Sequence, residues 1–200
     1  MPSHTVLQRL SMARVPGWRL ARPALVMLFV LSIGLRATAD ERLHLVTDGR
    51  GNATIVLPDV PTPLEKSAGV DLQRCLKKMS GAELPIVAEA TQPTGIRIEI
   101  GATKQGRRSR DLLRKANHRS EEACEISVTD RGIVLVGRND PATGHAVYSF
   151  LQQLGVRWLQ PSLAWEVVPR RKSVSVRIGQ QVMAPHFDRR GGLAVSATKM

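Results

Sequence analysis

The sequence predicts an α/β fold of the α+β-like kind, in which two main amphipathic helices pack on a mixed β-sheet. Short segments of alternating apolar residues recur after residue 40, and this spacing is typical of half-buried strands. Two longer segments, residues 63–80 and 141–154, repeat apolar residues at helical spacing instead. The helices alternate with strands along the chain. We therefore expect each helix to cover one face of a sheet.

Strands are expected in pairs at two places. A turn at residues 48–52 separates the first two strands, and a turn at residues 130–132 separates two later ones, so both pairs are expected to form hairpins. The helices should join parallel neighbours as crossovers, because a tight turn can connect only antiparallel strands. The expected strands are residues 43–47, 53–57, 84–87, 96–100, 125–129, 133–136, 156–159 and 174–178.

The first long helix has clear start and stop signals. Thr62 and Glu65 form a capping box around Pro63, which occupies the first helical position. Gly81 is expected to end the helix, because glycine readily adopts the left-handed conformation. Its expected apolar face consists of Leu64, Ala68, Leu72, Cys75, Leu76 and Met79.

The second long helix is marked in the same way. Asp140 is expected to cap it, Pro141 follows at the first helical position, and Gly155 supplies the stop. A short strand at residues 156–159 comes next. The expected apolar face consists of Ala146, Val147, Phe150, Leu151 and Leu154.

The first 39 residues differ from the rest of the chain. They contain five arginines and no acidic residue, then an apolar run at residues 24–35 and the sequence Ala37-Thr38-Ala39. This pattern predicts a secretory signal peptide at residues 1–39, cleaved after Ala39, and an exported protein. The alternative is a membrane anchor, although the run is shorter than the roughly 20 residues that a span needs.

A basic segment at residues 104–119 is the strongest local charge feature. Leu112 and Leu113 could anchor a short helix there, which would bind a polyanion or simply present a solvated face. Nucleic acid is not the expected partner, because no aromatic side chain is interleaved with the cations. The candidate polyanion-binding residues are Arg107, Arg108, Arg110, Arg114 and Lys115.

Metal and cofactor sites are not expected. The four histidines that follow the predicted signal peptide share no ligand spacing, and the two cysteines, Cys75 and Cys124, form no metal-binding motif. An exported protein could join Cys75 to Cys124, but two separately buried thiols are an equal alternative. The carboxylates are scattered, so no catalytic pair of acids is predicted.

Two stretches resemble glycoside hydrolases. ATGHAVYSFLQQLGVRWLQP, residues 142–161, followed by EVVP, resembles the N-terminal domain that precedes the catalytic barrel in family 67 α-glucuronidases. It is similar also to the related domain of β-hexosaminidases and to proteins that carry domain of unknown function 4838. PHFDRRG, residues 185–191, resembles the junction of β-hexosaminidases where this accessory domain ends. The matching arginine, Arg190, would reach sugar hydroxyls, or it is a linker arginine.

The resemblance covers residues 43–191 and implies the domain organisation. Residues 40–184 would form the accessory domain, and residues 185–200 would begin a catalytic barrel that holds the catalytic acids. Trp158 and Trp165 would contact that barrel or belong to the core. The expected function is a non-catalytic module of a secreted glycoside hydrolase. The alternatives are an exported binding module for acidic polysaccharide and a fragment of a complete α-glucuronidase-like enzyme.

Overall fold

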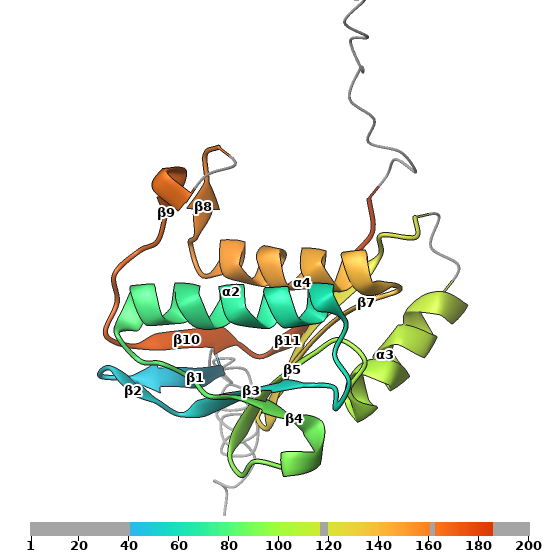
Figure 1. Ribbon diagram of the computed structural model, residues 1–200, viewed down its shortest axis with the longest axis horizontal. Coiled ribbons are helices and arrows are strands. Elements are labelled where there is room, and N and C mark those ends of the chain that lie inside the picture. Colours follow the sequence, from blue (N-terminus) through green and yellow to red (C-terminus); the bar gives the residue numbers. More distant parts are fainter. Residues whose placement is uncertain (1–40, 117–119, 161–162, 186–200) are drawn as a thin grey trace, which may run out of the picture. The chain divides into compact units, whose positions relative to one another are not determined.

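A computed structural model describes residues 41–116, 120–160 and 163–185 (Figure 1). The chain divides into two compact units, Met1–Ala39 and Asp40–Met200, and all described residues belong to the second. The predicted signal peptide, Arg119 and Arg190 lie outside the described residues.

A six-stranded mixed sheet confirms the predicted fold class. Its strand order is β11-β6-β7-β5-β3-β4. The last four strands run parallel, whereas β6 pairs antiparallel with both β7 and β11. The predicted hairpin of β6 and β7 is therefore confirmed, and the helix at residues 63–80 joins the parallel neighbours β3 and β4 as predicted. The crossover predicted for the second long helix is wrong, because that helix leads from β7 to residues 157–158, which pair with residues 166–167 outside this sheet. The bounds are β3 Ala53–Leu57, β4 Ile86–Ala88, β5 Ile96–Ile100, β6 Cys124–Val128, β7 Gly132–Gly137 and β11 Gly179–Met183.

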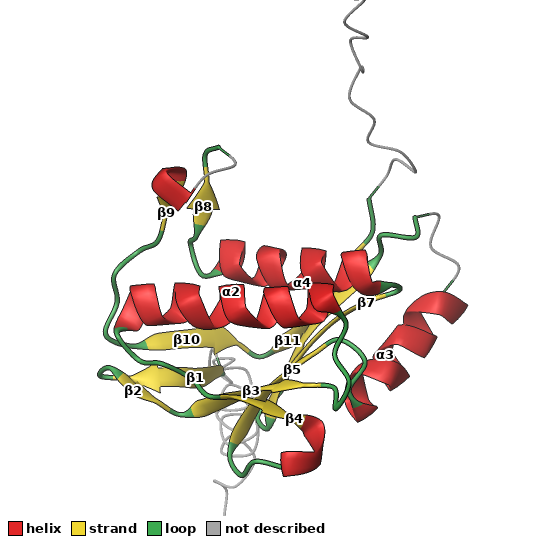
Figure 2. Cartoon of the chain, in the orientation of Figure 1, coloured by secondary structure: helices red, strands yellow, loops and turns green. Residues whose placement is uncertain are grey.

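Two long helices lie side by side over one face of this sheet (Figure 2). They are α2, Pro63–Ser80, and α4, Asp140–Gln153. The core fills the space between them and the sheet and is mostly aliphatic, with Phe150 as its one buried aromatic ring among the described residues. A shorter helix, α3, Lys104–Lys115, contacts β5, β6 and β7. It lies on the other face, where Arg97, Glu99 and Ser127 make the sheet surface polar.

The opening hairpin was predicted wrongly. The first strand, β1 Arg42–Thr47, pairs with the two-residue β2, Arg50–Gly51, and with β10, Val174–Arg177, in a separate antiparallel sheet. The chain then enters the six-stranded sheet as β3. Alternation of apolar residues identified both strands correctly, but it contains no information about which strand will be the partner.

Helix α2 begins and ends as predicted. Thr62 accepts a hydrogen bond from the Glu65 amide, and the Glu65 carboxylate accepts one from the Thr62 amide. Gly81 follows with φ of 82°. Leu64 was wrongly placed in the core, since it is half exposed, and the buried residue of the first turn is Glu65.

Two smaller differences concern α4 and α3. The cap of α4 is Asn139, whose side chain accepts from the Ala142 amide, and Asp140 lies in the first turn instead. Leu113 anchors α3 in the interior, whereas its neighbour Leu112 is exposed. The predicted cap of α4 was therefore wrong by one residue, and one of the two predicted anchors of α3 is confirmed while the other is wrong.

The remaining elements are short. A two-stranded hairpin, formed by β8, Arg157–Trp158, and β9, Glu166–Val167, lies beside the helix layer (Figure 1). The described part of the chain also contains two 3₁₀ turns, η1 at Glu89–Thr91 and η2 at Leu163–Trp165. Across the described ranges, no helix has the length and apolar character that a membrane crossing requires.

Candidate functional site

The β8–β9 hairpin is held to α2 by one carboxylate. The side chain of Glu166 is inaccessible to solvent, and both of its oxygens accept from Arg74, at 2.5 and 2.8 Å. Lys78 donates to the same carboxylate at 2.9 Å, and the Trp158 indole N–H donates at 3.1 Å. The hydrogen bonds from Arg74, then those from Lys78 and Trp158, lower the pKa of Glu166 to about 2, although burial opposes them.

Helix α4 joins this network through Tyr148. Its hydroxyl donates to Asp71 at 2.8 Å, and Asp71 also pairs with Arg74 at 3.1 Å. The Tyr148 ring meets Trp158 edge to face, with centroids 5.5 Å apart. The hairpin is therefore connected to both long helices by directional contacts, although a two-stranded ribbon is only marginally stable alone.

The outer face of the hairpin carries three exposed apolar side chains beside Arg157. Val167 lies opposite Arg157, and the Leu159 amide bonds to the Trp165 carbonyl. Because side chains alternate across a strand, Leu159, Trp165 and Val167 share the face that points away from the helices. They are 64%, 49% and 51% exposed.

The two tryptophans, which we expected either to contact the barrel or to belong to the core, differ in their exposure. Trp158 is half-buried in the Glu166 network, whereas Trp165 belongs to the exposed face. Sequence reasoning did not single out Leu159 or Val167. Because side chains alternate along a strand, both residues could have been predicted to lie on the face opposite to that of Trp158.

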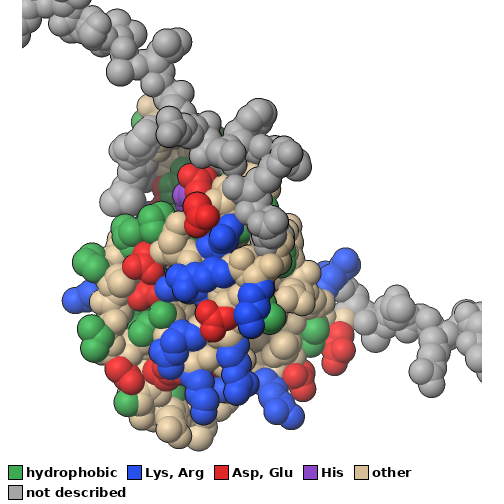
Figure 3. Space-filling model, turned by 90° about the vertical axis from the view of Figure 1, so that its right-hand side faces the viewer, with side chains coloured by type: hydrophobic (Ala, Val, Ile, Leu, Met, Phe, Trp, Pro, Cys, Tyr) green, Lys and Arg blue, Asp and Glu red, His purple; other side chains and the backbone are tan. Residues whose placement is uncertain are grey.

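Helix α3 presents a cationic surface, which Figure 3 shows as a gathering of Lys and Arg side chains on the face that carries this helix. Four of the five residues predicted to bind a polyanion are exposed on it. They are Arg107, Arg108, Arg114 and Lys115.

The fifth residue, Arg110, points inward. Its guanidinium donates to the Gly137 carbonyl at 3.0 Å and to the Thr143 hydroxyl at 3.2 Å. It also lies 3.6 Å from Glu65 and 3.3 Å from Asp140, with only 12% of its side chain exposed. Arg110 therefore connects α3 to α2 and α4 and is not available to a ligand.

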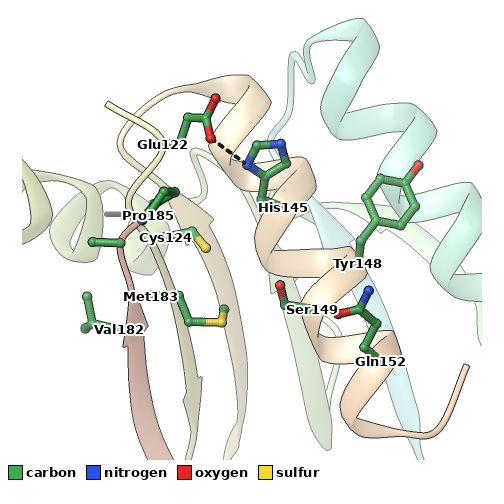
Figure 4. A pocket seen from close by; sticks show the side chains of 10 residues that line it. Glu122, Cys124, His145, Tyr148, Ser149, Gln152, Val182, Met183 and Pro185 are labelled. Carbon is green, nitrogen blue, oxygen red and sulfur yellow. Dashed lines mark ion pairs between the residues drawn. The ribbon is translucent and has the colours of Figure 1, made fainter. Parts of the chain in front are cut away.

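A pocket of about 580 Å³ lies between α4 and the end of β11 (Figure 4). His145 projects from α4 towards Glu122, with 3.9 Å between Nδ1 and the carboxylate. Burial raises the pKa of the Cys124 thiol, which also lines the pocket, to about 11, so this thiol stays protonated at neutral pH and is a poor nucleophile. Sequence reasoning missed this pocket because its residues come from separate elements.

Cys75 and Cys124 are both free and buried, which is the second of the two alternatives that the sequence left open. Within the described ranges, no group of three His, Cys, Asp or Glu side chains could hold a metal ion. The predicted sugar contact, Arg190, lies outside those ranges and remains a prediction.

Comparisons with known proteins show which solved structures share this fold. No protein-family model matches the sequence, and no curated protein matches it. The structure is similar to part of a family 115 4-O-methyl-α-glucuronidase with specificity for decorated arabinogalactans, with a TM-score of 0.53 and 18% identity over 74% of this chain and 19% of that chain.

Two family 20 enzymes are more distantly similar. A β-N-acetylhexosaminidase from Streptomyces coelicolor gives a TM-score of 0.44 and 16% identity over 71% of this chain and 23% of that chain. A chitobiase from Flavobacterium johnsoniae gives 0.43 and 14% over 76% and 21%. This chain thus spans about a fifth of each of these enzymes, and the glucuronidase likeness shows that it has a fold found within a larger glycoside hydrolase.

Proposed function

We propose that this chain is a non-catalytic module of an exported, carbohydrate-active glycoside hydrolase and supports a catalytic barrel of the same protein. The observation that carries the proposal is the likeness to the family 115 glucuronidase, in which the shared fold makes up 19% of the chain. Because fold alone does not establish chemistry, this likeness supports a module of such an enzyme and assigns it no catalytic role. The finer assignment, to the N-terminal domain of the family 67 type, is part of this proposal.

The hairpin supplies the proposed contact with the barrel. Its outer face carries Leu159, Trp165 and Val167 in exposed positions. On its inner face, Glu166 forms an ion pair with Arg74 of α2, which holds the hairpin in a fixed position. An apolar surface held in a fixed geometry suits a permanent domain interface, because little conformational entropy is lost when the partner covers it.

Two positions have subordinate roles in the proposal. Trp165 would be the main anchor in the interface, since aromatic side chains bury a large area with few rotatable bonds. Arg190 would contact sugar hydroxyls at the barrel entrance, because a guanidinium offers a planar set of donors.

The test begins with the gene. Translation of the DNA beyond the codon for Met200 should reveal a barrel sequence with paired acidic residues. The longer protein should hydrolyse a glycan that the 200-residue chain leaves intact. Sugar release by the 200-residue chain, or the lack of any barrel sequence downstream, would overturn the proposal.

A variant pair then tests the interface. Trp165→Ala should lower the Tm of the longer protein while leaving the Tm of the 200-residue chain unchanged, because the side chain is exposed without its partner. Val60→Ala is the matched control, since Val60 is also a highly exposed apolar residue but lies outside the hairpin. Equal effects of the two substitutions in the longer protein would exclude the hairpin as the interface.

A further inference from the structure

A polar groove runs beside the cationic helix α3. Its larger part has a volume of about 570 Å³ and is bordered on one side by Lys104, Arg107 and Arg108 of the helix. A smaller pocket of about 90 Å³ continues it along the sheet towards Ser127, Thr129 and Arg131. The two parts are neighbours, because Arg97, Glu99 and Gln105 line both.

We propose that this groove and the exposed side of α3 bind a polysaccharide that carries uronate groups. The inference deepens the proposed function, on which it rests, by naming the class of glycan that the module would hold.

The carboxylates of the groove are already engaged by the protein. The Asp59 carboxylate accepts a hydrogen bond from the Ala90 amide at 2.7 Å. This bond does not neutralise Asp59, whose negative charge stays at the edge of the groove. Glu89 accepts from the Lys104 amide at the start of α3 and lies 3.8 Å from the guanidinium of Arg107.

Glu99 is buried and is engaged in the same way. It accepts from the Thr103 hydroxyl at 2.8 Å and lies 3.5 Å from Arg97. The acids thus position the backbone and two of the arginines and do not balance the remaining cations.

The remaining cations are directed to solvent. The side chains of Lys104, Arg108 and Arg131 are exposed and pair with no acidic group among the described residues. Lys104 and Arg108 are four residues apart on α3, so they lie on one side of the helix, about 6 Å apart along its axis. A ligand in the groove would therefore meet a net positive charge on the α3 side and at Arg131, because five lining cations face three lining acids.

The chemistry of the lining favours a uronate over a nucleic acid. Arginine presents a fork of donors that matches a carboxylate. Gln105, Ser109, Ser127 and Thr129 add amide and hydroxyl groups suited to sugar hydroxyls. No aromatic ring lines either described pocket, whereas binding of single-stranded nucleic acid relies on base stacking.

Binding of polygalacturonate by the full chain, measured by calorimetry at low and moderate salt, tests the proposal. We expect saturable binding that weakens as salt screens the charges, and none to a neutral galactan of equal length. The double variant Lys104→Ala with Arg108→Ala should bind about fivefold more weakly, since each exposed ion pair contributes a fraction of a kcal/mol.

The matched control removes two charges elsewhere. Arg50→Ala with Lys172→Ala changes exposed cations near β1 and β2, in the other sheet. Equal weakening by both double variants would overturn the proposal in favour of an effect of net charge. Tighter binding of poly(U) RNA, or binding of the uronate-free dextran sulfate with no binding of polygalacturonate, would overturn the assignment to uronate. Either result leaves the proposed function standing, because that function depends on the downstream gene sequence.

Discussion

Replacing Glu166 with glutamine tests the network that holds the β8–β9 hairpin. The substitution keeps the shape of the side chain and removes the charge that Arg74 and Lys78 share. The pKa of Glu166 is lowered from 4.5 to about 2, chiefly by its hydrogen bonds from Arg74. At about 1.4 kcal/mol per pKa unit, this shift corresponds to about 3 kcal/mol of stability at neutral pH. Water reaches the partly exposed Arg74 and Lys78, so we expect a loss of about 2–3 kcal/mol.

The pH dependence has a definite sign. A carboxyl group whose folded pKa lies below its unfolded value stabilises the fold at pH values above the unfolded pKa. That stabilisation disappears as the pH falls towards the folded pKa. The difference in unfolding free energy between the wild type and Glu166→Gln should therefore be constant above about pH 5. This difference should shrink as the pH falls from 4.5 to about 2.

Urea unfolding followed by circular dichroism at pH 7 and pH 3 measures both quantities. The matched control is Glu83→Gln, because Glu83 forms an exposed pair with Lys77 and should contribute less than about 1 kcal/mol. A loss for Glu166→Gln no larger than that of Glu83→Gln, or a loss that is the same at both pH values, would refute the reasoning.

Four further predictions concern local structure. Gly144→Ala should raise the unfolding free energy by up to about 1 kcal/mol, because a Cβ there meets nothing within 4 Å inside a helix. Gly137→Ala should lower it by more than about 2 kcal/mol, because its Cβ would collide with the backbone of α4; equal thermal shifts for the two glycine variants would contradict both expectations. Thr62→Ala should cost about 1 kcal/mol through the lost cap of α2, and an unchanged urea midpoint would argue against it. Neither Cys75 nor Cys124 should react with a thiol reagent at pH 8 in the folded protein, since burial raises their pKa values to about 12 and 11, whereas both should react in denaturant.

The candidate site could be predicted from the sequence only in part. The run of basic residues located the exposed cations of α3, because charge content is a property of the segment itself. The same run included Arg110, whose partners Glu65 and Asp140 come from two other helices. Only the packing of α3 decides which side of the helix faces inward, so composition alone could not separate Arg110 from Arg108.

The β8–β9 hairpin, too, could be predicted from the sequence only in part. Trp158 and Trp165 were the right residues to select, but their opposite orientations follow from the pairing of β8 with β9. Glu166 is one of the carboxylates whose scattered positions in the sequence predict no catalytic pair. Its main partner, Arg74, is 92 residues away in the sequence, and no local pattern connects the two.

The sequence by itself determined the type of most elements and their ends. Thr62, Pro63 and Gly81 specify α2 through contacts between residues only a few positions apart, and such contacts can be read from consecutive letters. Only the tertiary structure decided that β1 joins β10 and not β3, and that one buried carboxylate binds the hairpin to α2. Those outcomes depend on which distant surfaces meet, and that depends on the packing of the whole chain.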